Sequence, residues 1–210
     1  MDKSFIEKFI SYVDTGIRPI LEIGCGKGNI TKFLEPDICI ELDKKMTDYL
    51  KNYNLVIADA RYLPILRGQL VSSLPYQITS DFFKEVVKLD NISKLILILQ
   101  KDFVDKILND PTYISFLLNY VFDIQTKDII PPRCFSPRPK VYSIITVFNR
   151  VREYNDDVDS LISCISRYRN KTLKNASKLC GLSSDNNLKV REFKPWQVLE
   201  LLNSVDLSYV

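Results

Sequence analysis

A glycine-rich stretch near the amino terminus has the residue types of a ligand-binding turn. The stretch 21–28, LEIGCGKG, places the acidic side chain of Glu22 before three alternating glycines, Gly24, Gly26 and Gly28. Glycines let the backbone turn tightly, and they let a ligand approach the amino terminus of the following helix. The spacing therefore predicts a ligand site where a first strand runs into a helix.

Two further acidic residues follow the next two short apolar runs. Glu41 lies at the end of the run 38–42, and Asp59 follows the run 55–58. The carboxyl ends of parallel strands meet at one edge of a sheet, where one carboxylate can accept both hydroxyls of a ribose and the other an adenine amino group. These positions predict a site for an adenosine-containing cofactor. A tight turn with two capping carboxylates and no ligand is the alternative.

The glycine spacing separates two classes of cofactor. The dinucleotide fingerprint G-x-G-x-x-G needs glycine at its sixth position, where this chain has Asn29. S-adenosylmethionine has no pyrophosphate and carries a cationic sulfonium, which suits an acidic neighbour such as Glu22. We therefore expect S-adenosylmethionine. An oxidoreductase is disfavoured by Asn29 and by the lack of histidine. We expect no metal and five reduced cysteines, because the chain has no histidine and no C-x-x-C pair.

The elements that must position these residues alternate between strand-like and helix-like patterns. Five short apolar runs, most followed by helix-length segments, predict a parallel sheet with helices on both faces. The runs are 20–23, 38–42, 55–58, 70–74 and 95–99. A β-branched run at 143–148 predicts one arm of a closing hairpin with 121–126.

Helical patterns stand at both ends of the chain. Ser4 and Glu7 have the spacing of a capping box, which predicts a helix over 4–13. Further helices are predicted over 158–168, 173–179 and 194–205. We therefore place a domain boundary near residue 152, with a catalytic domain at 1–152 and a small helical domain at 153–210. The longest apolar run, 95–99, is far shorter than the roughly 18 residues of a membrane span, so a cytoplasmic protein is expected.

Positive charge gathers in two segments, although the net charge is only +3. Residues 131–152 carry five basic and no acidic side chains, and residues 165–196 carry eight basic and two acidic. This asymmetry favours an anionic partner such as nucleic acid over an evenly charged surface. A solvated basic face is the alternative.

Several motifs together resemble those of the ribosomal RNA adenine N6,N6-dimethyltransferases of the KsgA type. They are the E-x-G-x-G-x-G turn, ELD at 41–43, DA at 59–60, LPYQIT at 74–79, LQKD at 99–102, FSPRPKVYS at 135–143 and RNKTLKN at 169–175. The closing segment 191–202 is also similar. The resemblance spans residue 20 to the carboxyl end, and the F-x-P-x-P-K-V-x-S match is its most specific part.

This resemblance implies a fold and a set of site residues. The fold would be α/β, with a Rossmann-like class I methyltransferase sheet and a small α-helical carboxy-terminal domain that binds RNA. The catalytic residues would be Ser73, Leu74, Pro75, Tyr76 and Phe135. The cofactor would be bound by Glu22, Gly24, Gly26, Gly28, Glu41, Leu42, Asp59, Ala60 and Ser73. RNA would be bound by Arg133, Arg138, Lys140, Arg167, Arg169, Lys171, Lys174 and Lys178.

The physical chemistry of an adenine amino group agrees with these roles. Its nitrogen is a poor nucleophile because the lone pair is delocalised into the ring. A polar side chain and the carbonyl before Pro75 can accept the two N6 hydrogens, while Tyr76 and Phe135 stack on the unstacked base. Tyr76 and Phe135 as plain core aromatics are the alternative. The implied substrate is two neighbouring adenosines near the 3′ end of small-subunit rRNA, in a pre-ribosomal particle, with the enzyme as a monomer.

Two departures from the family pattern keep other functions open. Ser73 stands where the family has asparagine, and Met1-Asp2 would begin at the end of the family's amino-terminal Q-x-F-L-x-D segment. Both favour a ribosome-assembly factor with weak or no methyl transfer. A large-subunit rRNA adenine methyltransferase shares the amino-terminal motifs and is the other alternative. The K-T-L-x-N and P-x-P-K-V-x-S segments favour the small subunit.

Overall fold

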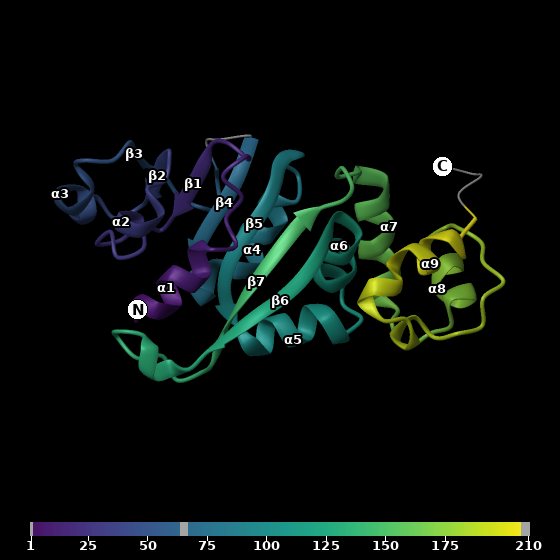
Figure 1. The fold of residues 1–210 in the computed structure, drawn as a ribbon. Helices are drawn as coiled ribbons and strands as arrows, with labels where there is room; N and C mark the ends of the chain where they lie inside the picture. Colours follow the sequence, from purple (N-terminus) through teal and green to yellow (C-terminus); the bar gives the residue numbers. More distant parts are fainter. Residues whose placement is uncertain (1, 64–66, 207–210) are drawn as a thin grey trace. The chain divides into compact units, whose positions relative to one another are not determined.

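The computed structural model describes residues 2–63 and 67–206, and a seven-stranded sheet dominates it (Figure 1). The strand order is β3-β2-β1-β4-β5-β7-β6. The strands are β1 (Ile20–Ile23), β2 (Ile38–Glu41), β3 (Leu55–Ile57), β4 (Arg67–Ser73), β5 (Asn91–Gln100), β6 (Phe122–Ile130) and β7 (Ser143–Arg150). The first five pair in parallel, and β7 pairs antiparallel with β5. The predicted α/β sheet is therefore confirmed as a mixed sheet.

Helices connect or follow these strands. They are α1 (Lys3–Ile10), α2 (Thr31–Leu34), α3 (Thr47–Leu50), α4 (Thr79–Val86), α5 (Lys101–Asn109), α6 (Tyr113–Val121), α7 (Asp156–Arg167), α8 (Leu173–Leu179) and α9 (Val198–Asn203). The predicted helix at 194–205 begins as a 3₁₀ turn, Pro195–Gln197, before α9. Within residues 2–63 and 67–206, no helix has the length and apolar character needed to cross a membrane.

Helices cover both faces of the sheet. Phe9 of α1 is fully buried in one cluster with Val147 of β7. Phe83 of α4 packs against Phe148, the next residue of β7, with ring centroids 5.1 Å apart. Because successive side chains of a strand point to opposite faces, α1 and α4 must lie on opposite sides of β7.

The start of α1 differs from the prediction. The capping box expected at Ser4 and Glu7 is wrong, because Asp2 is the N-cap and accepts a hydrogen bond from the Ser4 backbone N at 3.0 Å. Glu7 instead forms an ion pair with Lys3, at 3.4 Å. The helix therefore begins at Lys3, one residue before the predicted start at Ser4.

The chain forms two compact units, and the division differs from a single boundary near residue 152. One unit comprises residues 1–101 and 123–150, and the other comprises 102–122 and 151–210. The segment 102–122 therefore belongs with the carboxy-terminal residues. The reason is that α6 is largely apolar, and Phe116 is buried in one core with residues of α7, α8 and α9, among them Ile162, Leu173 and Leu201.

The cysteines also differ from the expectation that all five are reduced. Cys164 of α7 and Cys180, just after α8, form a disulfide within the second unit. Cys25 and Cys39 are free and buried, and Cys134 is free and partly buried. The disulfide partners are 16 residues apart, and only the packing of α7 against α8 brings them together.

Candidate functional site

The glycine turn after β1 has the predicted backbone shape. Gly24 and Gly26 have φ angles of 73° and 53°, which residues with a Cβ rarely adopt. A Cβ at Gly24 would meet nothing within 4 Å, so this glycine borders open space and is required by its φ rather than by crowding. Gly28 also has a positive φ and lies next to Leu50 and Thr31, and it lines neither of the cavities described below.

Glu41 holds this turn in place from the end of β2. Its Oε2 accepts a hydrogen bond from the Gly26 backbone N at 2.8 Å, and its Oε1 accepts one from the Asp43 backbone N, also at 2.8 Å. Each carboxylate oxygen keeps a second lone pair for a ligand hydroxyl. The residue predicted to bind a ribose therefore also fixes the loop against which a ribose would lie.

A cavity of about 300 Å³ adjoins the carboxyl ends of β1, β2 and β3. Five of the predicted cofactor residues line it, and these are Gly24, Glu41, Leu42, Asp59 and Ala60. Residues that the sequence analysis had not singled out also line it, among them Arg61 and Ile78. The cavity has a carboxylate at two of its strand ends, as an adenosine site requires.

Asp59 forms a forked ion pair with Arg61 in this cavity. Arg61 Nη2 lies 2.6 Å from Asp59 Oδ2, and Arg61 Nε lies 3.1 Å from both carboxylate oxygens. The hydrogen bonds from the Arg61 side chain and backbone lower the pKa of Asp59 below its usual value. Arg61 lines the cavity and was not predicted from the sequence, although its place two positions after Asp59 was a signal for this pairing.

A second cavity, of about 530 Å³, lies on the other side of Gly24 and Pro75, which line both cavities. It is lined by the predicted catalytic residues Ser73, Leu74, Pro75, Tyr76 and Phe135, and by Glu22, Gly24 and Gly26. Ser136, Pro137 and Pro139, from the proline-rich loop before β7, complete one wall. The structure thus brings the two predicted motifs together around one space.

Tyr76 is positioned by a partner far away in the sequence. Its hydroxyl lies 2.7 Å from the Oγ of Ser143, the first residue of β7. Ser143 is fully buried, whereas Tyr76 and Phe135 are half-buried in the wall of the larger cavity. The hydrogen bond restricts the tyrosine ring. In the sequence, Ser143 is the last residue of the FSPRPKVYS motif at 135–143, and the structure shows that it hydrogen-bonds to the Tyr76 hydroxyl.

Glu22 is an almost fully buried carboxylate at the edge of the same cavity. Its side chain is 1% exposed, and its Oε2 has no hydrogen-bond partner among the described residues. Burial raises the pKa of Glu22 to about 7, while the nearby Thr31 and Cys25 side chains oppose the rise. A buried carboxylate without a partner, next to open space, fits a cationic ligand.

The raised pKa of Glu22 predicts a pH-dependent stability. The unfolded chain loses this proton near pH 4.5 and the folded chain near pH 7, so wild-type stability should fall as the pH rises through that window. Glu22→Gln should remove this loss. The free energy of unfolding of the variant, relative to wild type, should increase by about 2–3 kcal/mol between pH 5 and pH 8. Urea unfolding at both pH values measures it, with the exposed Glu153→Gln as control. Parallel pH curves for Glu22→Gln and wild type would contradict the prediction.

The predicted RNA-binding residues are all exposed. In the first unit, Arg133, Arg138 and Lys140 flank Phe135 in the loop between β6 and β7. In the second unit, exposed basic side chains lie in and between α7 and α8, and these are Arg167, Arg169, Lys171, Lys174 and Lys178.

The structure adds two basic residues to the set in the second unit. The Arg191 backbone N donates to the Arg169 carbonyl at 2.9 Å, and the Val190 N donates to the Lys171 carbonyl at 3.0 Å. This pairing brings Lys189 and Arg191 beside Arg169 and Lys171. The sequence shows the charge of these two residues but not their position, because the pairing joins segments about 20 residues apart.

Known proteins resemble this chain in sequence and in fold. A family model described as "Ribosomal RNA adenine dimethylase" matches residues 66–192, which is more than half of the chain. A ribosomal RNA small subunit methyltransferase A from Mesomycoplasma hyopneumoniae (strain 232) is 31% identical over 167 residues, which cover 70% of this chain. The chain spans only 64% of that relative's length.

Two solved structures share the fold. A dimethyladenosine transferase from Plasmodium falciparum superposes with a TM-score of 0.73 at 23% identity, covering 84% of this chain and 74% of that one. The 23S rRNA methyltransferase ErmE superposes with a TM-score of 0.72 at 21% identity, covering 97% of this chain and 98% of that one. These likenesses confirm the Rossmann-like methyltransferase fold, and the family match confirms the resemblance drawn from the motifs. The chain therefore belongs to the ribosomal RNA adenine dimethylase family.

Proposed function

We propose that this chain is an S-adenosylmethionine-dependent rRNA adenine N6,N6-dimethyltransferase. Its substrate would be adjacent adenosines near the 3′ end of small-subunit rRNA in a pre-ribosomal particle. One observation carries the proposal: two cavities adjoin at Gly24 and Pro75, one lined by strand-end carboxylates and the other by Ser73–Tyr76 and Phe135. This pairing suits a nucleoside cofactor on one side and a flipped base on the other.

The residues of the smaller cavity fit the adenosine part of the cofactor. Glu41 offers two carboxylate oxygens to the ribose hydroxyls, and Asp59 offers an acceptor to the adenine amino group. The Glu22 Oε2, which has no hydrogen-bond partner within residues 2–63 and 67–206, lies at the larger cavity and suits the cationic end. When bound, S-adenosylmethionine supplies an electrophilic methyl group on its sulfonium.

The residues of the larger cavity would prepare the target base. Tyr76 and Phe135 offer aromatic faces on which an unstacked adenine can rest. The Ser73 hydroxyl and the Leu74 carbonyl would accept the N6 hydrogens, so that the nitrogen lone pair turns toward the methyl donor. Orientation and hydrogen bonding are the chemistry proposed here, and no histidine is needed.

The choice of the small subunit rests on sequence likeness. The relative that is 31% identical is named as a small-subunit rRNA methyltransferase. The large-subunit enzyme ErmE shares the fold of this chain but only 21% of its aligned residues. We further propose that the enzyme acts in the cytoplasm and as a monomer.

The test is methylation of purified small subunits that lack the modification. The protein is incubated with these subunits and methyl-labelled S-adenosylmethionine, and the 3′ end of the rRNA is mapped by mass spectrometry. Dimethyladenosine at two neighbouring positions is the expected result. Label in large-subunit rRNA alone, or particle binding without label, would overturn the proposal in favour of the large-subunit enzyme or an assembly factor.

Arg61 should weaken cofactor binding, because it competes with adenine for Asp59. Arg61→Leu should therefore tighten the Kd for S-adenosylmethionine about two- to fivefold, as measured by calorimetry. Arg18→Leu is the matched control, since Arg18 forms a similar forked ion pair with Asp37, and neither residue lines the two site cavities. Weaker binding by Arg61→Leu would mean that the arginine positions Asp59 instead.

Arg138 and Lys140 should contact phosphates beside the target base. In their double alanine variant, two phosphate contacts are lost. The slope of log Kd for small subunits against log salt concentration should therefore be shallower by about 1.5. The Kd for S-adenosylmethionine should not change. The exposed pair Lys51 and Lys88 provides the matched double-alanine control. An unchanged salt slope would assign Arg138 and Lys140 to a solvated surface.

A further inference from the structure

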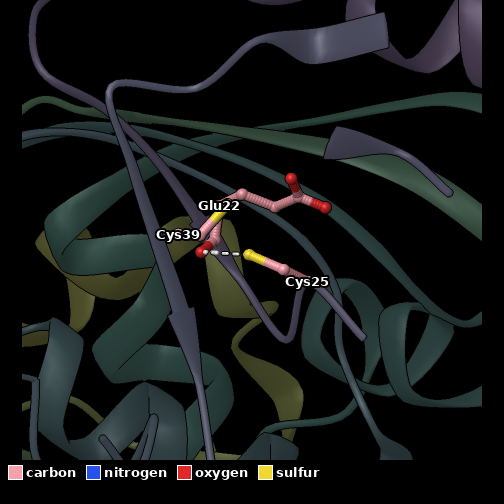
Figure 2. Close-up of side chains that lie close together, drawn as sticks. All are labelled: Glu22, Cys25 and Cys39. Atoms are coloured by element: carbon pink, nitrogen blue, oxygen red, sulfur yellow. Dashed lines mark hydrogen bonds between the residues drawn. The ribbon is translucent and has the colours of Figure 1, made fainter. Parts of the chain in front are cut away.

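Beneath the glycine turn, three side chains that commonly bind metals lie close together. They are Glu22 of β1, Cys25 of the turn and Cys39 of β2, and one ligand atom from each lies within 4.8 Å of the others. All three are almost fully buried, at 1%, 4% and 0% exposure. Figure 2 shows the two sulfur atoms close to each other, with the Glu22 side chain beside them.

The backbone fixes this arrangement. Glu22 and Cys39 are direct neighbours in the parallel pairing of β1 and β2, so their side chains point to the same face. The turn at Gly24 returns the chain over them, and the Cys25 Sγ lies 3.3 Å from the Glu22 carbonyl oxygen. The three side chains therefore meet because of strand register and turn shape, whether or not a ligand is present.

The chemistry of this set suits a soft divalent cation of the zinc class. Two sulfurs and one carboxylate are ligands that zinc and cadmium prefer, and zinc often leaves its fourth position to water. A tetrahedral zinc site places its ligand atoms about 3.5–3.8 Å apart, so atoms that lie within 4.8 Å of one another need to approach by roughly 1.3 Å at most. Glu22 and Cys25 also line the larger cavity, which gives a cation and its water a route from solvent.

The Glu22 carboxylate is the second observation that points to a ligand. Its Oε2 is buried without a hydrogen-bond partner among the described residues. A buried carboxylate oxygen without a partner costs free energy, and a bound cation would remove that cost. The sequence, with no histidine and no C-x-x-C pair, predicts no metal, whereas these ligands come from two neighbouring strands and the turn between them.

We propose that Glu22, Cys25 and Cys39 form a binding site for a zinc-class divalent cation. Binding forms two sulfur–metal bonds and one oxygen–metal bond, and the two thiol protons, together with any proton on the Glu22 carboxyl, pass to solvent. The cation binds the Glu22 carboxylate, which faces the larger cavity and is the group proposed to hold the cationic end of S-adenosylmethionine. The bound cation therefore excludes this cofactor. This second part rests on the proposed function, whereas cation binding itself does not. Because linkage is reciprocal, the cofactor must weaken cation binding by the same factor.

The first experiment is titration of the full chain with Cd²⁺, whose bonds to thiolates produce an ultraviolet charge-transfer band. We expect one Cd²⁺ per chain. Removal of a residue that only hydrogen-bonds to a metal ligand typically weakens metal binding 10- to 100-fold. Removal of a ligand itself in Cys39→Ser should therefore weaken Cd²⁺ binding at least about 100-fold. Cys134→Ser is the matched control, because Cys134 is the other free cysteine and lies outside the cluster. Circular dichroism checks that each variant folds, and Cys39→Ala replaces Cys39→Ser if it does not.

The outcomes separate this inference from the proposed function. Equal Cd²⁺ affinity in wild type and in the Cys39 variants, or loss of binding in Cys134→Ser alone, would overturn the metal site. Calorimetry then measures the Kd for S-adenosylmethionine with and without Cd²⁺. We expect Cd²⁺ to raise this Kd at least tenfold in wild type and not in Cys39→Ser. Simultaneous binding of both ligands would overturn the exclusion, whereas no cofactor binding in metal-free wild type would instead count against the proposed function.

Discussion

Replacement of Tyr76 by alanine should lower kcat/KM for rRNA methylation about 10- to 100-fold. Tyr76 lines the larger cavity together with Phe135. Stacking of a base on an aromatic ring contributes about 1–3 kcal/mol. An adenine without this surface would be held less often in the orientation for transfer. Single-turnover methylation of small subunits measures the loss. The Kd for S-adenosylmethionine should change less than kcat/KM, because the adenosine part of the cofactor is proposed to lie in the smaller cavity, which does not include Tyr76.

Two milder variants separate the ring from its hydroxyl. Tyr76→Phe keeps the aromatic surface and loses the hydrogen bond to Ser143, so kcat/KM should fall by no more than about tenfold. Ser143→Ala should have a similar effect, and the double variant should be no worse than either single variant, because both remove the same contact. Activity of Tyr76→Ala equal to wild type would exclude a stacking role. A Tyr76→Phe variant as impaired as Tyr76→Ala would assign the role to the hydroxyl.

The sequence predicted the parts of this site that depend on local chain geometry. Alternating apolar runs, and glycines that need positive φ, are local signals, so the sheet and the turn at Gly24 could be placed correctly. The two cavities follow from that placement, because strand-end residues of a parallel sheet meet at one edge. A matched motif then linked the loop of Phe135 to the turn at Tyr76, although they lie about 60 residues apart.

The missed features depend on tertiary packing. The contact between Tyr76 and Ser143 joins residues 67 positions apart, and no sequence period marks it. The segment 102–122 belongs to the second unit because the apolar residues of α6 pack with α7, α8 and α9, a choice that hydrophobicity alone does not indicate. The cluster of Glu22, Cys25 and Cys39 likewise depends on strand register. Sequence patterns thus identify which residues are buried, whereas the fold decides which of them meet.

Replacement of Glu41 by alanine should raise the Kd for S-adenosylmethionine at least about 100-fold. The variant loses the proposed acceptor of the ribose hydroxyls, and it also frees the Gly26 and Asp43 backbone N–H groups that the carboxylate now holds. Hydrogen bonds to a charged group contribute about 1.5–3 kcal/mol each, so the loss of the two proposed hydrogen bonds from the ribose hydroxyls is enough for a 100-fold change in Kd. Calorimetry of cofactor binding, with thermal unfolding in parallel, measures both consequences.

A matched variant separates the binding role of Glu41 from its structural one. Asp37, before β2, also accepts a hydrogen bond from a backbone N–H, that of Ile20, and lines neither cavity. Asp37→Ala should therefore lower the melting temperature and leave the cofactor Kd nearly unchanged. Glu41→Ala should change both. Equal cofactor affinity in Glu41→Ala and wild type would remove Glu41 from the site. A higher cofactor Kd in Asp37→Ala would mean that general loosening of β1 and β2 explains the effect.

Because Glu41 fixes the turn at Gly26 from the end of β2, we expect its loss to disturb the larger cavity as well. The methylation rate of Glu41→Ala should therefore be lower than that of wild type even at saturating cofactor.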